Sequence, residues 1–214
     1  MKMNNQSKRL YQISRLDNAG EGWQSNLVPA DVNVFPWPAS ADKDYRPVTA
    51  VKAAVYDNSL LVFMETDETE IRAEEKDFSN KVHTDSCMEF FLMPSPYNSA
   101  QYINWEINPV GALNLSIGTH RYDRHPINIE NYRKLFNVRT NIHNAGWNLE
   151  YRIPLSFLRR IFPILELRSG HSMRGNFYKC GDKTARPHYA CWSPIELAEP
   201  DFHCPYFFGD LVLA

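Results

Sequence analysis

Carboxylate side chains alternate with apolar ones in three segments that are rich in strand-forming residues. Glu89 lies in SCMEFFLM, Glu106 in YINWEIN and Glu150 in WNLEYRI. Because successive side chains of a strand point to opposite faces, each segment would have one apolar face and one face that bears a carboxylate. Glu89 and Glu106 could then supply the acid and the nucleophile or base of glycoside hydrolysis, provided that their separation suits it.

The grouping of these polar residues depends on how the segments pair. If all three lie in one sheet, one face gathers Glu89, Asn104, Glu106, Glu150 and Arg152. For Glu150 and Arg152 a solvated face is the simpler interpretation, because antiparallel sheets often expose one side to water. Glu89 differs, since its same-face neighbours Phe91 and Met93 argue against a plain solvated face.

The stretch PHYACWSPIELAEPDFHCPYFFG, residues 187–209, places many aromatic side chains between four prolines. Trp192 lies in a predicted loop here, where an indole either fills the interior or forms a platform for a flat ligand. A pyranose has one apolar face of axial C–H bonds, while its equatorial hydroxyls reach outward to polar side chains. A platform beside Glu89 would therefore suit a saccharide, and Tyr189 and His203 could extend it.

Metal and thiol chemistry have weaker support in the sequence. The acidic stretch ETDETEIRAEEKD, residues 65–77, offers the oxygen donors that calcium prefers, but it lacks EF-hand spacing, and a charged solvated loop is the alternative.

The chain has four cysteines, of which no two are spaced as CxxC, and this argues against a zinc knuckle or a thioredoxin-like motif. We expect Cys87 to be a buried free thiol. Cys191 and Cys204 could meet across the final loop, and Cys191 with His188 is a weak candidate for a nucleophile and its base.

The composition limits the classes of protein to which this chain can belong. The 214 residues carry a formal net charge of −2 with scattered basic residues, which excludes the basic stripe that nucleic-acid binding needs. No apolar run approaches the roughly 18 residues that span a membrane, and the N-terminus lacks the apolar region of a secretory signal. The predicted location is cytoplasmic, or outside the cell if a leader has been removed.

Short apolar runs with turn residues between them predict a sheet-rich fold. The expected strands are residues 49–56, 59–66, 86–93, 102–108, 112–117, 135–142, 147–153, 173–180 and 206–213. One short helix is expected from Ser156 to about Phe162. This pattern predicts an all-β, antiparallel, jelly-roll-like sandwich rather than a βαβ fold. We expect residues 1–9 to be frayed and residues 10–214 to form a single domain.

The order and spacing of several sequence blocks resemble the family 9 carbohydrate-binding modules and their DOMON-like relatives. The blocks are AVYDNSLLVFMETDETEIRA, DSCMEFFLMP, YINWEINPVGAL, WNLEYRIPLSFL, NFYKCGD, CWSPI and FHCPYFFGDLVL, so the resemblance runs from about Trp23 to Ala214. It implies a non-catalytic β-sandwich, linked to polysaccharide breakdown, that binds glucan or xylan chain ends and small sugars between two aromatic side chains. No cofactor is required, although calcium is sometimes bound nearby.

The resemblance also implies a set of site residues. Trp192 matches the stacking tryptophan, and Glu89 matches the glutamate of the DSxxEFF block. His83 stands where the second ring is a tryptophan, so we expect weaker binding or another ligand. The remaining predicted contacts to hydroxyl groups come from Asn104, Glu106, Arg72, Tyr189 and His203, with a surface salt bridge as the alternative for Arg72.

Two other functions stay open at this point. One is a glycoside hydrolase that uses Glu89 and Glu106, and the other is a DOMON-like sandwich that serves protein contacts.

Overall fold

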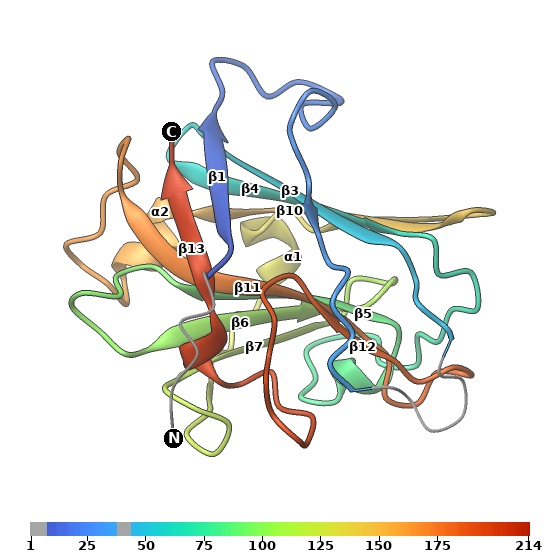
Figure 1. Ribbon diagram of the computed structural model, residues 1–214. Coiled ribbons are helices and arrows are strands. Elements are labelled where there is room, and N and C mark those ends of the chain that lie inside the picture. Colours follow the sequence, from blue (N-terminus) through green and yellow to red (C-terminus); the bar gives the residue numbers. More distant parts are fainter. Residues whose placement is uncertain (1–7, 38–43) are drawn as a thin grey trace.

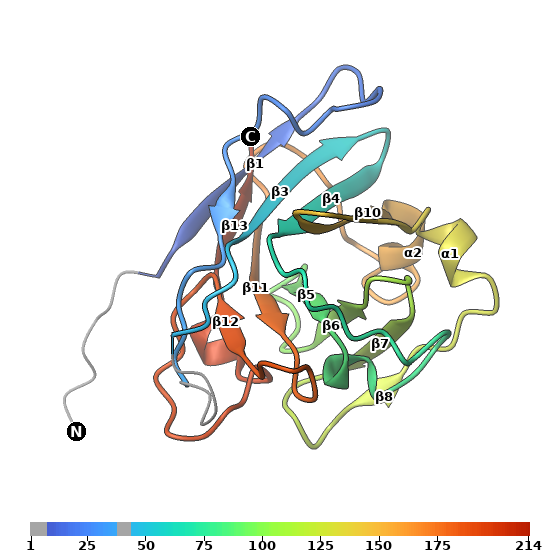
Figure 2. The ribbon, with the colours of Figure 1, turned by 90° about the vertical axis from the view of Figure 1, so that its right-hand side faces the viewer.

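The chain folds as a curled sheet whose two halves face each other across an apolar core (Figures 1 and 2). The computed structural model describes residues 8–37 and 44–214, so the predicted frayed segment 1–9 lies outside them except for its last two residues. Within the described ranges the sheet has 13 strands, and the helices are short. None of these helices is long and apolar enough to cross a membrane. The prediction of a β-sandwich is confirmed.

The first layer of the sandwich carries the central strands of the sheet. Its strands lie in the order β8-β7-β6-β5-β11-β13, and β12 pairs with β11 at one end. Their bounds are His125–Pro126 (β8), Leu113–Gly118 (β7), Tyr102–Ile107 (β6), Cys87–Met93 (β5), Ser172–Cys180 (β11), Gly209–Leu213 (β13) and Tyr189–Cys191 (β12). All pairings inside this layer are antiparallel, as predicted.

The second layer lies across the first, as Figure 2 shows for β3, β4 and β10. Its strands lie in the order β3-β4-β10-β9, and β2 pairs with β3. The bounds are Ala30–Asp31 (β2), Thr49–Tyr56 (β3), Ser59–Thr66 (β4), Arg139–His143 (β9) and Gly146–Pro154 (β10). These pairings are antiparallel too.

The N-terminal strand β1, Leu10–Arg15, joins the two layers and makes the sheet mixed rather than purely antiparallel. Its residues 10–13 pair in parallel with β13, and its residues 14 and 15 pair in parallel with β3. Strand β1 was not among the expected strands, although its buried Tyr11 and Ile13 alternate with more exposed residues. The sheet therefore passes from one layer to the other without a free edge at this side.

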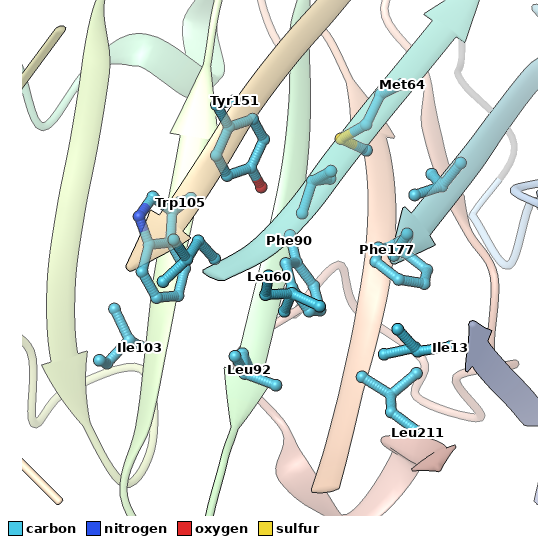
Figure 3. Packing of buried hydrophobic residues seen from close by; sticks show 14 of the residues in the cluster. Ile13, Leu60, Met64, Phe90, Leu92, Ile103, Trp105, Tyr151, Phe177 and Leu211 are labelled. Atoms are coloured by element: carbon cyan, nitrogen blue, oxygen red, sulfur yellow. The ribbon is translucent and has the colours of Figure 1, made fainter. Parts of the chain in front are cut away.

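The alternation predicted along the strands is confirmed in the core (Figure 3). The side chains that fill the space between the layers include Met88, Phe90 and Leu92 of β5, Ile103, Trp105 and Ile107 of β6, and Leu149, Tyr151 and Ile153 of β10. Two short helices close the core beside Trp105: α1, Tyr132–Leu135, brings Phe136, and α2, Leu155–Arg159, brings Phe157. Each ring meets the indole nearly edge-on.

The outer face of the first layer is covered as well, so β5 and β6 are buried at every position. The segment after β12 folds back over this face and forms a second apolar cluster with it. That cluster contains Trp37, Phe91, Met93, Tyr102, Tyr178, Cys191, Ile195 and Phe208. The aromatic stretch at the C-terminus therefore serves mainly to cover a sheet that would otherwise expose apolar side chains to water.

Trp192 is a core residue, which corrects its predicted role as a stacking platform. Its side chain is buried in the cluster between the layers and contacts the rings of Tyr11 and Phe177. The indole lies against Gly209, the first residue of β13, where a side chain would meet it. The glycine of the FGDLVL block thus makes room for the tryptophan of the CWSPI block.

Several predicted boundaries differ from the structure for local reasons. Residues 205–207 form a 3-10 turn that begins at Pro205, so the last strand starts at Gly209 rather than at residue 206. The apolar pair at 135–136 ends α1, and Asn137 has a positive φ of 48°, so β9 starts only at Arg139. The second helix begins one residue earlier than predicted and ends at Arg159.

We predict that Gly209→Ala destabilises the protein by about 1–3 kcal/mol, because an added Cβ would meet the indole of Trp192 and would lie 2.7 Å from the carbonyl oxygen of Arg9. Urea denaturation measures the free energy of unfolding. Gly20→Ala is the matched control, since its Cβ would meet only Asn18 at 3.9 Å. Equal stability of the two variants would contradict the close packing of Trp192 on β13.

Candidate functional site

A cavity of about 410 Å³ opens on the outer face of the first layer, beyond the part covered by the C-terminal segment. Six of the eight predicted site residues line it: His83, Glu89, Asn104, Glu106, Tyr189 and His203. They come from β5, β6, β12 and two loops that are far apart in sequence. The cavity has the size of a small-molecule pocket, which typically measures about 300–1,000 Å³.

Strands β5 and β6 form the polar floor of this pocket. Glu89 and Glu106 face each other in register on these neighbouring strands, and both are buried. The two carboxylate oxygens of Glu106 accept hydrogen bonds from the amides of Asn104, at 2.8 Å, and Asn114, at 2.9 Å. One oxygen of Glu89 accepts a hydrogen bond from the thiol of Cys180 at 3.0 Å. The floor is thus a fixed hydrogen-bonding array and not a solvated face.

Two negative charges are unfavourable on this floor because both carboxyl groups are buried. Burial raises the pKa of Glu89 well above its ordinary value, and the charge of Glu106 raises that pKa further. The pKa of Glu106 is also raised by burial, although the Asn114 amide and the charge of His83 oppose the shift. We therefore expect the protonated carboxyl of the pair to be Glu89.

His83 stands at the side of the pocket on a 3-10 turn, Val82–Thr84, and its side chain is 42% exposed. Its Nδ1 lies 4.0 Å from a carboxylate oxygen of Glu106, and its Nε2 lies 3.9 Å from one of Asp182. The amide of Asp182 donates to the carbonyl of His83 at 3.2 Å, so the two loops are joined. His83 therefore lines the pocket, and its contact with a ligand stays a prediction.

Arg72 does not line the pocket, and the salt bridge named as its alternative is present. Its Nη1 donates to Asp85 at 2.9 Å and its Nη2 to Glu74 at 2.7 Å. Its Nε donates to the carbonyl of Lys183 at 3.1 Å. Arg72 thus connects the loop before β5, which carries His83, to the loop after β11. It stabilises these two loops from outside the pocket.

The aromatic wall of the pocket comes from residues other than Trp192. Trp37, Tyr189 and Phe202 line the cavity together. The ring of Phe202 stacks on Tyr178 with centroids 4.1 Å apart, and Trp37 lies 5.7 Å from Phe202. The indole of Trp37 donates to a carbonyl of the C-terminal segment at 2.8 Å, so this wall is fixed by the backbone. Only Tyr189 of the three was predicted as a site residue.

His203 lines the same pocket as a neutral ring. Its Nδ1 lies 2.9 Å from the hydroxyl of Tyr102, and its ring packs 4.8 Å from that of Phe91. Burial lowers its pKa to about 3, with the charges of Arg124 and Arg121 acting in the same direction. His203 therefore serves as a hydrogen-bonding partner and not as a cation.

Arg124 is a pocket residue that sequence reasoning missed. It lies over the ring of Tyr102 at 4.3 Å, and its Nη2 donates to Asn104 and to the carbonyl of Ser116. Its Nε and Nη1 have no hydrogen-bond partner among the described residues. The residue follows a turn that Asp123 fixes by accepting hydrogen bonds from Thr119. Nothing in the run HRYDRHP distinguishes this arginine from a solvated one.

Trp192 and His83 face different parts of the molecule, so the predicted clamp over Glu89 is wrong. Trp192 is 4% exposed, and its small exposed part lines another depression, beside Tyr11 and Asn33. Glu150 and Arg152 are also absent from the lining, because β10 belongs to the second layer. A solvated face, the simpler interpretation for Glu150 and Arg152, is therefore the one that holds.

A buried charge cluster explains His188 and part of the acidic stretch. Lys179 donates to Glu68 and to Nε2 of His188, both at 2.8 Å, and Trp147 donates to Glu68 at 3.1 Å. Burial lowers the pKa of His188 to about 3, so its ring is neutral. The two ring nitrogens contact Lys179 and the Arg186 carbonyl, which leaves neither as a base for Cys191.

The other carboxylates of residues 65–77 are partly engaged by cations. Glu70 pairs with Arg186 at 2.8 Å, and Glu74 pairs with Arg72. Calcium binding by this stretch stays a prediction. Cys191 and Cys204 are both free thiols.

We predict that Glu89→Gln changes the dependence of stability on pH. The folded pKa of Glu89 is raised above 4.5, so above that pH the folded protein holds a proton that the unfolded chain has released. The wild type should therefore lose stability relative to the variant as pH rises, by at most about 1.4 kcal/mol per unit. Urea denaturation from about pH 5 to about pH 8, with EDTA present, measures the difference.

The control for this measurement is Glu150→Gln on β10, which lies outside the pocket and should not reproduce the change. A difference between Glu89→Gln and wild type that stays constant with pH would contradict a protonated Glu89.

Comparisons with known proteins identify the family and the fold. The family model for carbohydrate-binding family 9 matches residues 23–213. A candidate carbohydrate-binding protein from Bacteroides uniformis is similar in structure, with a TM-score of 0.80 and 27% sequence identity over 97% of this chain and 100% of that one. A search of the curated proteins found no match.

A family 9 carbohydrate-binding module from Caldicellulosiruptor kristjanssonii shares the fold. Its structures in complex with glucose and with cellotriose each give a TM-score of 0.64 and 14% identity. They cover 96% of this chain and, respectively, 96% and 93% of the solved chains. Because the family model matches most of the sequence, this protein belongs to carbohydrate-binding family 9.

Proposed function

We propose that the pocket on the outer face of the first layer binds a mono- or oligosaccharide without cleaving it. The observation that carries this proposal is the meeting of a buried polar floor and an aromatic wall in one cavity of about 410 Å³. A pyranose has two surfaces that complement these features: an apolar ring face for the aromatic wall and a rim of hydroxyl groups for the polar floor. Membership of carbohydrate-binding family 9 supports the proposal.

The aromatic wall would take the apolar face of the sugar. Phe202 is the central ring of the wall, and its stacking on Tyr178 holds it in place. Tyr189 meets Phe202 at a steep angle, so the two rings form a corner rather than a parallel clamp. His83, half-exposed across the pocket, would add a smaller contact. This arrangement differs from two facing tryptophans, and we expect modest affinity.

The polar floor and Arg124 would form hydrogen bonds with the hydroxyl groups of the sugar. The free Nε–H and Nη1–H of Arg124 can donate, and Glu106 and Asn104 can accept after small rotations. A protonated Glu89 would donate as well as accept. A neutral polyol with several neighbouring hydroxyls therefore matches the pocket better than an apolar ligand does.

We propose glucose and short glucans as the first sugars to test, because the similar module from Caldicellulosiruptor kristjanssonii was solved with glucose and with cellotriose. Xylobiose belongs in the same panel. We further propose that binding needs no cofactor, which a titration in EDTA tests directly.

The hydrolase alternative rests on the facing pair Glu89 and Glu106. Their hydrogen bonds favour a binding role, because the amides of Asn104 and Asn114 hold both oxygens of Glu106 and the Cys180 thiol bonds to Glu89. Hydrolysis of an aryl glucoside that disappears in Glu89→Gln would favour the enzyme instead.

We predict that glucose or cellotriose changes the tryptophan fluorescence of the protein in a saturable way, because Trp37 lines the pocket. Arg124→Lys should weaken binding roughly 10- to 100-fold, since lysine lacks the planar fork and a hydrogen bond to a charged group contributes about 1.5–3 kcal/mol. Isothermal titration calorimetry gives the dissociation constants.

Two control variants accompany this titration. Arg133→Lys alters an arginine that also lies over a tyrosine and bonds to backbone carbonyls, but outside the pocket. Trp192→Phe alters the tryptophan in the core. Both should bind sugar as the wild type does, although Trp192→Phe should be less stable. The proposal fails if no sugar in the panel binds at millimolar concentration, or if Arg133→Lys weakens binding as much as Arg124→Lys.

A further inference from the structure

Two thiols and a carboxyl group meet at the floor of the pocket. Cys87 and Glu89 lie two residues apart on β5 and share a face, and Cys180 ends β11 directly opposite Cys87. One ligand atom from each residue, two Sγ atoms and a carboxylate oxygen, lies within 4.8 Å of the other two. All three side chains are buried, and the Sγ of Cys180 lies 3.0 Å from the carboxylate of Glu89.

We propose that Cys87, Glu89 and Cys180 form a binding site for a divalent cation of the zinc class. Zinc takes thiolate sulfur at about 2.3 Å and carboxylate oxygen at about 2.0–2.2 Å, so the ligand atoms of a tetrahedral site lie roughly 3–4 Å apart. Small side-chain rotations would bring the three groups to that spacing. Calcium does not suit the site, because it prefers oxygen donors alone.

The strand pairing preorganises these ligands. Each residue is fixed by a β-ladder that is buried on both faces, so the three donors converge without any loop having to move. Lys179, the residue before Cys180 on β11, points to the other face, where Glu68 and His188 contact its ammonium group. The charge of Lys179 is therefore paired with Glu68 and not with the carboxyl group of Glu89.

Protons would compete with a cation for these three ligands. Burial raises the pKa of Cys87 to about 12, and it raises the pKa of Glu89 well above the ordinary value. The hydrogen bond to Cys87 and burial likewise raise the pKa of Cys180. A bound cation would replace the protons of the two thiols and of the carboxyl group, so three protons leave as one dication enters. Affinity should accordingly rise with pH.

The fourth position of the site would face the pocket. Glu89 and Cys180 line the cavity, whereas Cys87 lies behind them. Three protein ligands and one open position are the arrangement of zinc sites that bind water or a further ligand. The site goes beyond sugar binding, and either property can be present without the other.

The test uses the full chain, reduced and freed of metal with EDTA that is then removed. Titration with Co²⁺ should saturate at one equivalent with a thiolate-to-cobalt absorption band in the near ultraviolet, and Zn²⁺ should abolish the band by displacement. The apparent affinity should fall about tenfold or more for each unit by which pH is lowered, because protons compete for the ligands. Ca²⁺ should not displace the cobalt.

Cys87→Ser and Cys180→Ser should each weaken Co²⁺ binding at least 100-fold. Cys191→Ser is the matched control, because this buried cysteine lies in a different cluster and should leave the titration unchanged. Thermal unfolding provides a second measurement, in which Zn²⁺ raises the Tm of the wild type and of Cys191→Ser but not of the other two variants.

The inference is overturned if the reduced wild type shows no cobalt band. It is also overturned if the band survives in Cys180→Ser or is lost to the same extent in Cys191→Ser. A sugar titration run in EDTA separates the two proposals, since failure of metal binding would leave sugar binding intact.

Discussion

The burial of β5 and β6 on both faces is the constraint on which the rest of the molecule depends. One face of each strand fills the core between the layers, and the other face carries Glu89, Asn104 and Glu106. A buried polar side chain is costly unless it is hydrogen-bonded, so this second face needs both a cover and partners. The C-terminal segment covers part of it with aromatic rings, and the uncovered remainder is the pocket.

The covering segment stays in place because side chains of β11 form hydrogen bonds to its backbone. The hydroxyl of Tyr178 donates to the carbonyl of Phe202, and the side chain of Asn176 both donates to and accepts from the backbone of Ser193. These anchors all lie on β11, which pairs with β5 and β13 in the first layer. The aromatic wall is therefore attached to the strand that pairs with β5 of the polar floor, which favours a preformed pocket over one that closes on its ligand.

The buried pair of Lys179 and Glu68 fixes the C-terminal end of β11. An unpaired charge at that depth would cost several kcal/mol, but here the indole of Trp147 and the neutral ring of His188 complete the hydrogen bonds. The turn that follows β11 carries Asp182, and β12 carries Tyr189, both of which line the pocket. A charge cluster outside the pocket thus positions two of its lining residues.

Alternation along the strands was enough to predict the floor, because the period of two is local and Glu89 has apolar same-face neighbours. The family resemblance added His83, which lines the pocket. Arg124, Trp37 and Phe202 could not be predicted, since each reaches the site from a loop whose path depends on distant contacts. The prediction for Trp192 failed because its residue type suits a platform and a core equally. Its burial between the layers, against Gly209, shows that it has the core role.

Glu89 stands where the two proposed chemistries meet, because it lines the pocket and belongs to the cation cluster. As a protonated carboxyl it can donate to a hydroxyl group, whereas as a metal ligand it loses that proton and acts as a negative donor. A sugar and a cation would therefore each change the form of Glu89 that the other meets. Binding free energies that share a group in this way are linked reciprocally, so any effect of the cation on sugar affinity must equal the effect of the sugar on cation affinity. The pairing of Cys180 with Cys87 across the sheet then places this coupling in the β5–β11 ladder itself.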